Sequence, residues 1–245
     1  MAITLPTNKI PASTQDPKRL IIFSKPKAGK STALANLPEC LCIDLENGGY
    51  DYIDAVKVKV NNVKELKELC TAIKEAGCPY KFIALDTISR LEDMVKPLAL
   101  KLFQDTPAGS SFKGDDVLDA AHGAGYGALR KAVEMCIDMV AKCAPNIILV
   151  CHSKDAAVGS SDLTAKQISL TGKTGAILAS KSDAIGYLTR DENSNTILSF
   201  NTNDTSIEAG ARPAHLRNKD VILGEMQNDG TIEYHWDRIY PSLAQ

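Results

Sequence analysis

The feature that most constrains this chain is an apolar run that stops at a turn ending in Gly-Lys-Ser. Leu20 to Phe23 are apolar, the turn covers Ser24 to Gly29, and a helical pattern begins at Lys30. A strand, a loop and a helix in this order form a phosphate-binding loop, where backbone N–H groups and the helix N-terminus face an anion. The junction therefore predicts a phosphate-binding site.

The ligand expected at this loop is ATP with Mg²⁺. Lys30 is expected to reach the outer phosphates, and the Ser31 hydroxyl is expected to bind the metal. Ser24 departs from the motif, which has glycine at this position, and serine adopts a positive φ less readily than glycine. The predicted ATP-binding residues are the whole loop and the first helical residues: Ser24, Lys25, Pro26, Lys27, Ala28, Gly29, Lys30, Ser31 and Thr32.

The sequence contains two Gly-Lys-Ser/Thr triplets. The triplet at 29–31 would be accidental if it only happened to begin a helix, but the strand and the helix lie on the sides that the motif requires. A second triplet, at 172–174, also lacks the leading glycine and follows a mixed polar stretch. It is interpreted as a loop.

Composition places the chain among single-domain proteins of a reducing compartment. The 245 residues suffice for one large α/β domain, and the net charge of −2 does not predict a strongly basic surface, although a local basic groove is compatible with it. Seven cysteines are scattered without paired Cys-x-x-Cys motifs, so zinc is not expected. No signal peptide or membrane-spanning stretch is expected, and the predicted location is cytoplasmic.

Apolar strands alternate with amphipathic helices through most of the chain. This alternation predicts a mostly parallel sheet with helices on both faces, followed by an antiparallel C-terminal extension. Two polar segments, 104–122 and 155–173, are predicted to be surface loops. Strands are expected at 20–23, 40–44, 81–86, 146–151, 184–189, 196–201 and 232–236. Helices are expected at 62–76, at 88–103 with a kink at Pro97, and at 126–143. The expected segments are a lead-in at 1–19, a core at 20–225 and a terminal strand and tail at 226–245.

Three polar side chains follow predicted strands and are candidates for chemistry. Asp86 ends an apolar strand, where a carboxylate can organise Mg²⁺, although Asp86 or Thr87 could instead cap the following helix. Glu46 follows the second strand and could orient a water for attack on phosphorus. Asp44 and Asp51 compete with Glu46 for that role.

His152 follows the predicted strand at 146–151 in the same manner. There a histidine could touch the terminal phosphate and report hydrolysis to the polar segment behind it. The alternative is an ordinary structural hydrogen bond, which is the commoner role of a single histidine. The position before a long polar segment favours the sensor interpretation.

Taken together, these stretches resemble the RecA-like ATPase core. The likeness is to the compact form found in phage-encoded single-strand annealing recombinases and in AAA-type ATP-binding proteins of phages. It covers roughly residues 20–221. The stretches that carry it are Phe23–Thr32, Cys42–Glu46, Phe82–Ile88 and Ile147–Ser153, with weaker similarity at Ser182–Ile185 and Gly210–Arg212.

The resemblance implies a set of roles. Glu46 matches the catalytic glutamate, Asp86 the Walker B aspartate and His152 the polar γ-phosphate sensor. Arg212 resembles the basic residue that reaches a neighbouring subunit's nucleotide, which implies a homo-oligomer. The loops around Gly109 and Gly159 would match the two DNA-binding loops, and host cytoplasm would be the location of a phage protein.

Three functions are compatible with these features. The leading hypothesis is Mg²⁺-dependent ATP hydrolysis coupled to single-stranded DNA in phage-type recombination. The second is an assembly or packaging ATPase with a protein partner, and the third is a small-molecule kinase. No phosphoacceptor site is recognisable for a kinase, and the DNA assignment depends mainly on the family resemblance.

Overall fold

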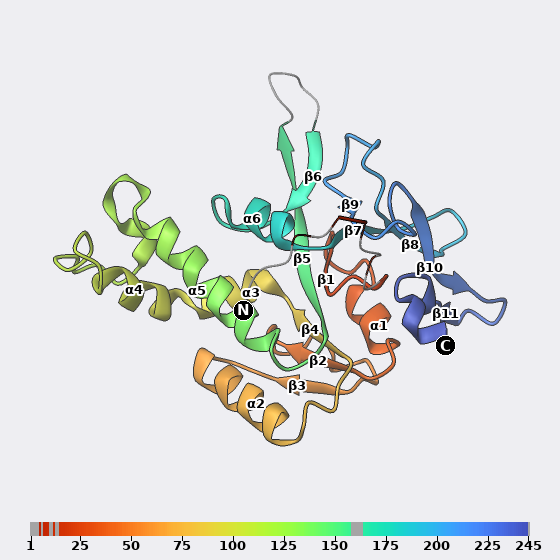
Figure 1. The fold of residues 1–245 in the computed structure, drawn as a ribbon, viewed down its shortest axis with the longest axis horizontal. Coiled ribbons are helices and arrows are strands. Elements are labelled where there is room, and N and C mark those ends of the chain that lie inside the picture. Colours follow the sequence, from red (N-terminus) through yellow and green to blue (C-terminus); the bar gives the residue numbers. More distant parts are fainter. Residues whose placement is uncertain (1–4, 6, 10–11, 13–14, 158–163, 245) are drawn as a thin grey trace.

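The fold is built on one mixed β-sheet with helices on both faces (Figure 1). The structure is a computed structural model that describes residues 5, 7–9, 12, 15–157 and 164–244. Its strands are β1 (Arg19–Ser24), β2 (Cys40–Asp44), β3 (Lys57–Lys59), β4 (Phe82–Asp86), β5 (Asn146–Ala157), β6 (Thr164–Ile168), β7 (Ala184–Arg190), β8 (Thr196–Ser199), β9 (Gly210–Ala211), β10 (Asp220–Met226) and β11 (Ile232–Tyr234).

The helices connect these strands in the alternating order that the sequence predicts. They are α1 (Lys30–Ala35), α2 (Val63–Glu75), α3 (Ile88–Met94), α4 (Lys96–Gln104), α5 (Gly125–Val140) and α6 (Thr174–Lys181). Short 3₁₀ helices occupy Val117–Asp119, Ala121–Gly123, Trp236–Arg238 and Pro241–Ala244. Among the described residues, no helix combines the length and apolar character needed to cross a bilayer.

The sheet has the order β11-β10-β8-β7-β1-β5-β4-β2-β3. The six strands from β7 to β3 are parallel, and β8, β10 and β11 extend the sheet in antiparallel fashion. The predicted fold class is confirmed. Because the strands are parallel, their carboxyl ends share one edge: Ser24 pairs with His152, and Asp44 pairs with Asp86.

Each face of the sheet has its own apolar core, because successive side chains of a strand point to opposite faces. Ile21 and Phe23 of β1 pack into the core that contains α2 to α5. Leu20 and Ile22 pack into the other core, with α1 and Trp236. Burial of each such side chain stabilises the fold by about 1.5–3 kcal/mol. These cores hold β1 firmly, so the loop that follows β1 starts from a fixed point.

The helix predicted over 88–103 is two helices. α3 ends at Met94 and α4 begins at Lys96, with Pro97 in its first turn. Proline lacks an N–H and its ring clashes with the preceding turn, so it is accommodated at a helix start and not in a helix interior. The break at Val95 is the physical consequence of Pro97.

The prediction of a loop over 155–173 was wrong for much of its length. β5 continues to Ala157 and pairs with β6 in an antiparallel hairpin that projects from the sheet (Figure 1). The residues around Gly159 lie outside the described residues. Most side chains in the outer part of this hairpin are polar or exposed, so it lacks the apolar pattern by which strands are recognised. In the triplet at 172–174, Gly172 and Lys173 form a turn and Thr174 begins α6.

The segment 104–122 is more ordered than a plain surface loop. It contains two 3₁₀ helices, and Val117 is fully buried. The Phe112 ring packs against Phe103, with 5.6 Å between the ring centroids. A Cβ at Gly109 would lie 2.1 Å from the Phe103 carbonyl oxygen, so only glycine fits this turn. The segment closes the far end of the α4–α5 pair (Figure 1).

Candidate nucleotide-binding site

The loop between β1 and α1 has the backbone of a phosphate cradle. Gly29 stands at the N-cap of α1 with φ of 101°, and Lys27 has φ of 63°. Such left-handed angles turn the chain sharply between strand and helix, and the free N–H groups of the first helical turn then face the loop. The positive φ at Gly29 is the point where the motif needs its glycine.

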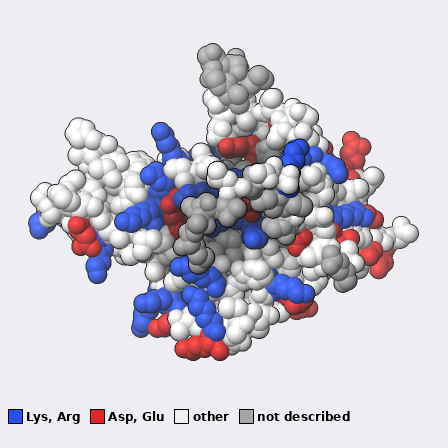
Figure 2. Space-filling model, in the orientation of Figure 1, with Lys and Arg blue, Asp and Glu red and all other residues white. Residues whose placement is uncertain are grey.

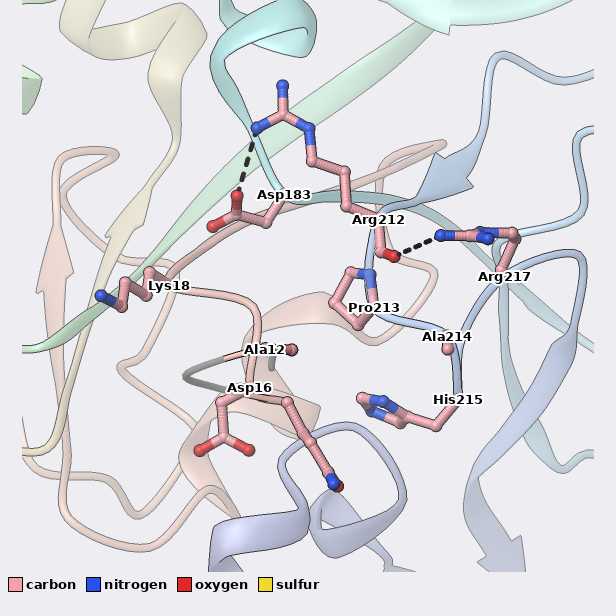
Figure 3. A pocket seen from close by; sticks show the side chains of 10 residues that line it. Ala12, Asp16, Lys18, Asp183, Arg212, Pro213, Ala214, His215 and Arg217 are labelled. Carbon is pink, nitrogen blue, oxygen red and sulfur yellow. Dashed lines mark hydrogen bonds and ion pairs between the residues drawn. The ribbon is translucent and has the colours of Figure 1, made fainter. Parts of the chain in front are cut away.

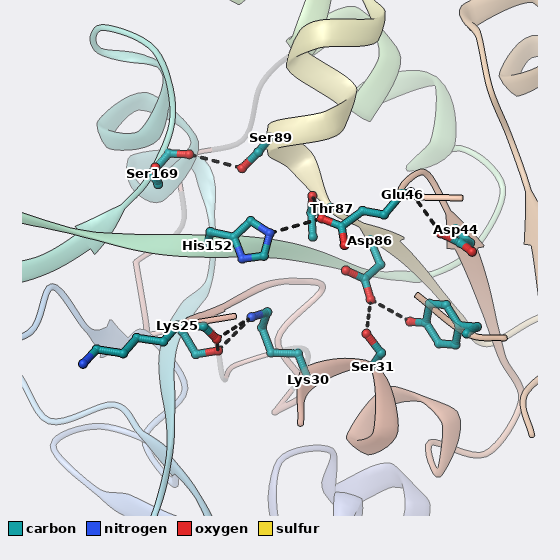
Figure 4. Close-up of polar contacts among 12 residues, drawn as sticks. Lys25, Lys30, Ser31, Asp44, Glu46, Asp86, Thr87, Ser89, His152 and Ser169 are labelled. Carbon is teal, nitrogen blue, oxygen red and sulfur yellow. Dashed lines mark hydrogen bonds and ion pairs between the residues drawn. The ribbon is translucent and has the colours of Figure 1, made fainter. Parts of the chain in front are cut away.

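Ser24 occupies the motif's first position without needing a positive φ, since it is the last residue of β1. Its hydroxyl donates to the Lys25 carbonyl over 2.9 Å and accepts a hydrogen bond of 2.8 Å from Lys30 Nζ (Figure 4). Lys30 Nζ also donates to the Lys25 carbonyl over 3.1 Å. The replacement of glycine therefore gives the buried ammonium group a side-chain partner.

Ser31 and Asp86 meet at the start of α1. Ser31 Oγ donates to Asp86 Oδ2 over 2.7 Å, and the Tyr50 hydroxyl donates to the same oxygen over 2.9 Å. Asp86 is only 4% exposed, and Tyr50 is fully buried. Burial raises the pKa of the Asp86 carboxyl, while the hydroxyls of Ser31 and Tyr50 act in the opposite direction. The buried carboxylate is thus surrounded by donors that favour its charged form.

Burial also lowers the pKa of the Lys30 ammonium group, because removal from water disfavours its charge. The negative charges of Asp86 and Glu46 oppose this effect. The site therefore places the partly desolvated Lys30 ammonium group near the carboxylates of Asp86 and Glu46.

Glu46 and His152 form the other side of the site. Glu46 Oε1 accepts a hydrogen bond of 2.8 Å from Thr87 Oγ1, and His152 Nε2 lies 3.1 Å from the same oxygen (Figure 4). Glu46 Oε2 has no hydrogen-bond partner among the described residues. Both side chains are partly exposed, so one carboxylate oxygen is anchored and the other is left for a ligand or water.

The competing acids Asp44 and Asp51 have other contacts. Asp44 is buried and accepts hydrogen bonds from the backbone N–H groups of Glu46 and Gly48, at 2.9 and 3.2 Å. Asp51 is paired with Lys59 at 2.8 Å. Asp44 therefore shapes the turn that presents Glu46, and Asp51 holds the outer part of the same loop.

A cavity of about 450 Å³ lies between these groups. It brings together most of the predicted site residues, whereas Ser24, Lys25 and Ala28 support the loop without lining the cavity. The lining residues are Pro26, Lys27, Gly29, Lys30, Ser31, Thr32, Glu46, Gly49, Ile53, Asp86, Thr87 and His152.

The donors in this cavity fit Mg²⁺. Ser31 and Asp86 offer a hydroxyl and a carboxylate oxygen in contact with each other. Within the described part of the chain, no group of three or more His, Cys, Asp or Glu side chains could hold a metal ion alone. Mg²⁺ prefers one or two protein oxygens and completes its shell with water and substrate phosphates. The residues present match that requirement.

Arg212 lies away from this cavity. Its backbone N–H donates to the Asp183 carbonyl, just before β7, so it stands at the opposite edge of the sheet from the P-loop. The guanidinium is 3.4 Å from Asp183 Oδ1 and donates to the Ser180 carbonyl over 2.9 Å. It lines a separate cavity of about 710 Å³ with Lys18 and Arg217 (Figure 3). Among the described residues its ion-pair partner is Asp183, and not Glu208 or Asp204, which are nearer in the sequence.

Sequence reasoning missed two residues of the site. Thr87 is the N-cap of α3, but its hydroxyl donates to Glu46 and makes no cap hydrogen bond. Tyr50 contacts Asp86 from 36 residues away in the sequence. The position of Thr87 directly after Asp86 was a usable signal, while nothing local in the sequence marks Tyr50.

The cradle, the Ser31–Asp86 pair and the parallel sheet define a P-loop protein of the nucleotide-binding ATPase class. A family model described as an AAA domain matches residues 16–216, which is more than half of the chain. The chain therefore belongs to this AAA domain family.

Solved structures with a similar arrangement were also found. A KaiC-like protein of the archaeon Pyrococcus horikoshii is 11% identical, with a TM-score of 0.48, over 91% of this chain and 90% of that one. The RadB recombinase is 12% identical, with a TM-score of 0.45, over 90% of this chain and 92% of that one. No curated protein matched the sequence.

Proposed function

We propose that this chain hydrolyses ATP with Mg²⁺ and couples hydrolysis to single-stranded DNA. The observation that carries the ATPase proposal is the meeting of Lys30, Ser31, Asp86, Glu46 and His152 around one cavity. These are the groups that phosphoryl transfer to water needs: a phosphate cradle, a metal site and a carboxylate for the nucleophile.

Lys30 and the loop N–H groups bind the phosphates and neutralise charge as it moves toward the leaving oxygen. Ser31 and Asp86 would hold Mg²⁺, which would supply Lewis-acid stabilisation of the negative charge that develops on the phosphates. Tyr50 keeps the Asp86 carboxylate oriented, since it donates to Oδ2 from a fully buried position.

Glu46 orients the attacking water through its second oxygen. Thr87 and His152 hold Oε1, so Oε2 is the atom that accepts a hydrogen bond from water and takes its proton. The hydrogen bonds that Asp44 already makes favour Glu46 over Asp44 for this role.

His152 connects this chemistry to the β5–β6 hairpin. It lies on β5 beside Ser24, directly before Ser153, where the pairing with β6 begins. A change in the contact between His152 and Glu46 on loss of the terminal phosphate would be transmitted along one continuous strand. This geometry supports the sensor role, and it makes the hairpin the element that responds to nucleotide.

Single-stranded DNA is the proposed partner, with the hairpin and the segment 104–122 as its contacts. On the face drawn in Figure 2, Lys and Arg side chains are interspersed with Asp and Glu and do not form one continuous basic stripe. Mixed charge of this kind also suits a protein partner, which is the second candidate. Single-stranded DNA is compatible with this mixed-charge surface if it contacts the protein through the projecting elements alone.

Assembly and location complete the proposal. A homo-oligomer would bring Arg212 of one subunit to the nucleotide of the next, which its exposure and its distance from its own P-loop allow. The seven free cysteines, six of them buried, suit a compartment that keeps thiols reduced, in line with the predicted cytoplasmic location.

The test is ATP turnover with Mg²⁺, measured with and without single-stranded DNA, for the wild type and Lys30→Ala. We expect turnover by the wild type, stimulation by DNA, and loss of activity in a variant that keeps its circular dichroism spectrum. Undiminished turnover by Lys30→Ala would overturn the ATPase assignment. Turnover that ignores DNA would favour the protein partner.

A further inference from the structure

Arg190 lies against the phosphate-binding loop from a strand that the mechanism does not use. It ends β7, which runs parallel to β1 with Phe23 opposite Tyr187, so the end of β7 extends alongside the loop. A Cβ added to Gly29 would lie 3.3 Å from Arg190 Nη2. The guanidinium is therefore in contact range of the loop residue that precedes Lys30.

No acid within the described residues is paired with this guanidinium. The neighbouring Asp191 carboxylate is directed into the β7–β8 turn, where it accepts from Asn195 N and Nδ2 at 2.8 and 2.9 Å. Burial raises the pKa of the Tyr234 hydroxyl on β11, and the charge of Arg190 acts in the opposite direction, so the guanidinium is near enough to Tyr234 to influence it.

The loop already carries a concentration of positive charge. Lys25, Lys27 and Lys30 belong to it, and Arg190 adds a further cation beside Gly29. Like charges gathered on one loop repel, and the repulsion is weakened by water because Lys25, Lys27 and Arg190 are exposed. A bound polyphosphate relieves this repulsion, which makes Arg190 a group poised for an anion.

The order of the strands indicates which phosphate of the nucleotide lies nearest to Arg190. Glu46 and His152 mark the terminal phosphate, and their strands β2 and β5 lie on one side of β1. β7 lies on the other side of β1. We propose that Arg190 binds the α-phosphate of the nucleotide held by its own subunit, an inference that rests on the proposed nucleotide-binding function. A planar guanidinium suits this task because it can donate two parallel hydrogen bonds to phosphate oxygens.

The experiment compares Arg190→Ala with the wild type in calorimetric titrations of ATP, ADP and inorganic tripolyphosphate, each with Mg²⁺. We expect all three dissociation constants to rise by a similar factor of about 10 to 100, because loss of a charge-assisted hydrogen bond has effects of this size. Arg190→Lys should recover part of the affinity, since it keeps the charge and loses the planar fork. Lys219→Ala is the matched control: it removes an exposed cation before β10 that has no side-chain partner among the described residues.

Two other results would overturn this inference, and a third would overturn the proposed function. Equal affinities of Arg190→Ala and the wild type would overturn the inference. So would a loss confined to ATP and ADP with tripolyphosphate unchanged, since that pattern places Arg190 on the base or ribose. A wild type that binds no nucleotide would instead overturn the proposed function, so the two failures are distinguishable.

Discussion

At the scale of single residues, the site depends on how each buried charge is satisfied. Lys30 is buried with its ammonium group on Ser24 Oγ and the Lys25 carbonyl, and Asp86 is buried with two hydroxyl donors on one oxygen. An unsatisfied buried charge costs several kcal/mol, so each of these partners has a structural as well as a catalytic consequence. Ser24 shows that a departure from a motif can supply such a partner.

Glu46→Gln tests whether Glu46 activates water while Lys30, Ser31 and Asp86 bind ATP and Mg²⁺. The amide keeps the size of the side chain but cannot accept a proton from water, so turnover should fall by about 100- to 10,000-fold. ATP and Mg²⁺ should still bind, because Lys30, Ser31 and Asp86 are unchanged. The measurement is single-turnover hydrolysis alongside equilibrium binding of a fluorescent ATP analogue. Asp51→Asn is the control, because Asp51 is paired with Lys59 outside the cavity. Full activity in Glu46→Gln would return the role to Asp44 or Asp51.

Tyr50→Phe tests whether the Tyr50 hydroxyl orients Asp86 for Mg²⁺ binding. The change removes one hydroxyl from a fully buried ring and leaves Asp86 Oδ2 with Ser31 as its remaining donor. Groups that orient metal ligands typically contribute about 10-fold or more to metal affinity, so the Mg²⁺ concentration for half-maximal turnover should rise by about 10-fold. Turnover at saturating Mg²⁺ should recover toward the wild-type value.

The matched control for this change is two residues away. Tyr52 is fully exposed, so Tyr52→Phe removes a hydroxyl from the same loop without touching Asp86. The Mg²⁺ dependence of Tyr52→Phe should match the wild type. A purely structural role for Tyr50 would lower thermal stability and leave the Mg²⁺ dependence unchanged, which would contradict the positioning role.

At the scale of elements, the sequence predicts what is buried and misses what is exposed or long-range. The strands β1, β2, β4 and β7 were predicted to within a residue or two at each end, because they are nearly continuous apolar runs. β3 has three residues at the edge of the sheet and offers no such run. β10 was missed although it contains Val221 and Leu223, since Gly224 and a shift of register interrupt its pattern.

In the candidate site, too, contacts between residues distant in the sequence were not predicted. Lys30 and Ser31 could be predicted from the order of strand, loop and helix around Gly-Lys-Ser. Glu46, Asp86 and His152 could be predicted because each lies at or just beyond the end of an apolar run. The contacts of Tyr50 with Asp86 and of Arg190 with Gly29 could not, because each joins elements whose proximity is decided only by the order of strands in the sheet.

The β5–β6 hairpin and the segment 104–122 are the elements proposed to bind DNA, and hydrogen exchange tests both. Backbone amides at 153–157, 164–168 and 104–122 should exchange more slowly on addition of single-stranded DNA with ATP, because bound DNA covers them and orders their surroundings. α2 lies elsewhere on the sheet and serves as the internal reference (Figure 1). Protection of neither element would favour the protein partner.

At the scale of the whole molecule, the nucleotide cavity and Arg212 lie at opposite edges of the sheet. The carboxyl edge holds the nucleotide cavity, and the amino edge of β1 and β7 presents Arg212 beside a second cavity (Figure 3). A head-to-tail assembly would apply the amino edge of one subunit to the carboxyl edge of the next. Such heterologous contacts form rings or filaments and let a subunit complete its neighbour's site.

Arg212 carries the last prediction, that it acts on a neighbouring subunit's nucleotide. Its guanidinium side chain is 65% exposed, and it is held by a long ion pair of 3.4 Å with Asp183 and a hydrogen bond of 2.9 Å to the Ser180 carbonyl. Exposed contacts of this kind contribute little free energy. It directly follows β9, and Pro213 comes next and fixes the exit of the chain. An arginine delivered to the transferred phosphoryl group stabilises its developing charge and contributes about 10³- to 10⁵-fold to turnover in other P-loop proteins.

Arg212→Ala alone should therefore lose nearly all activity while still binding ATP. A mixture of Arg212→Ala with Lys30→Ala should recover a measurable fraction, because an intact cavity in one subunit then meets an intact arginine in the other. Normal turnover by Arg212→Ala under conditions where light scattering shows an oligomer would rule out the action in trans.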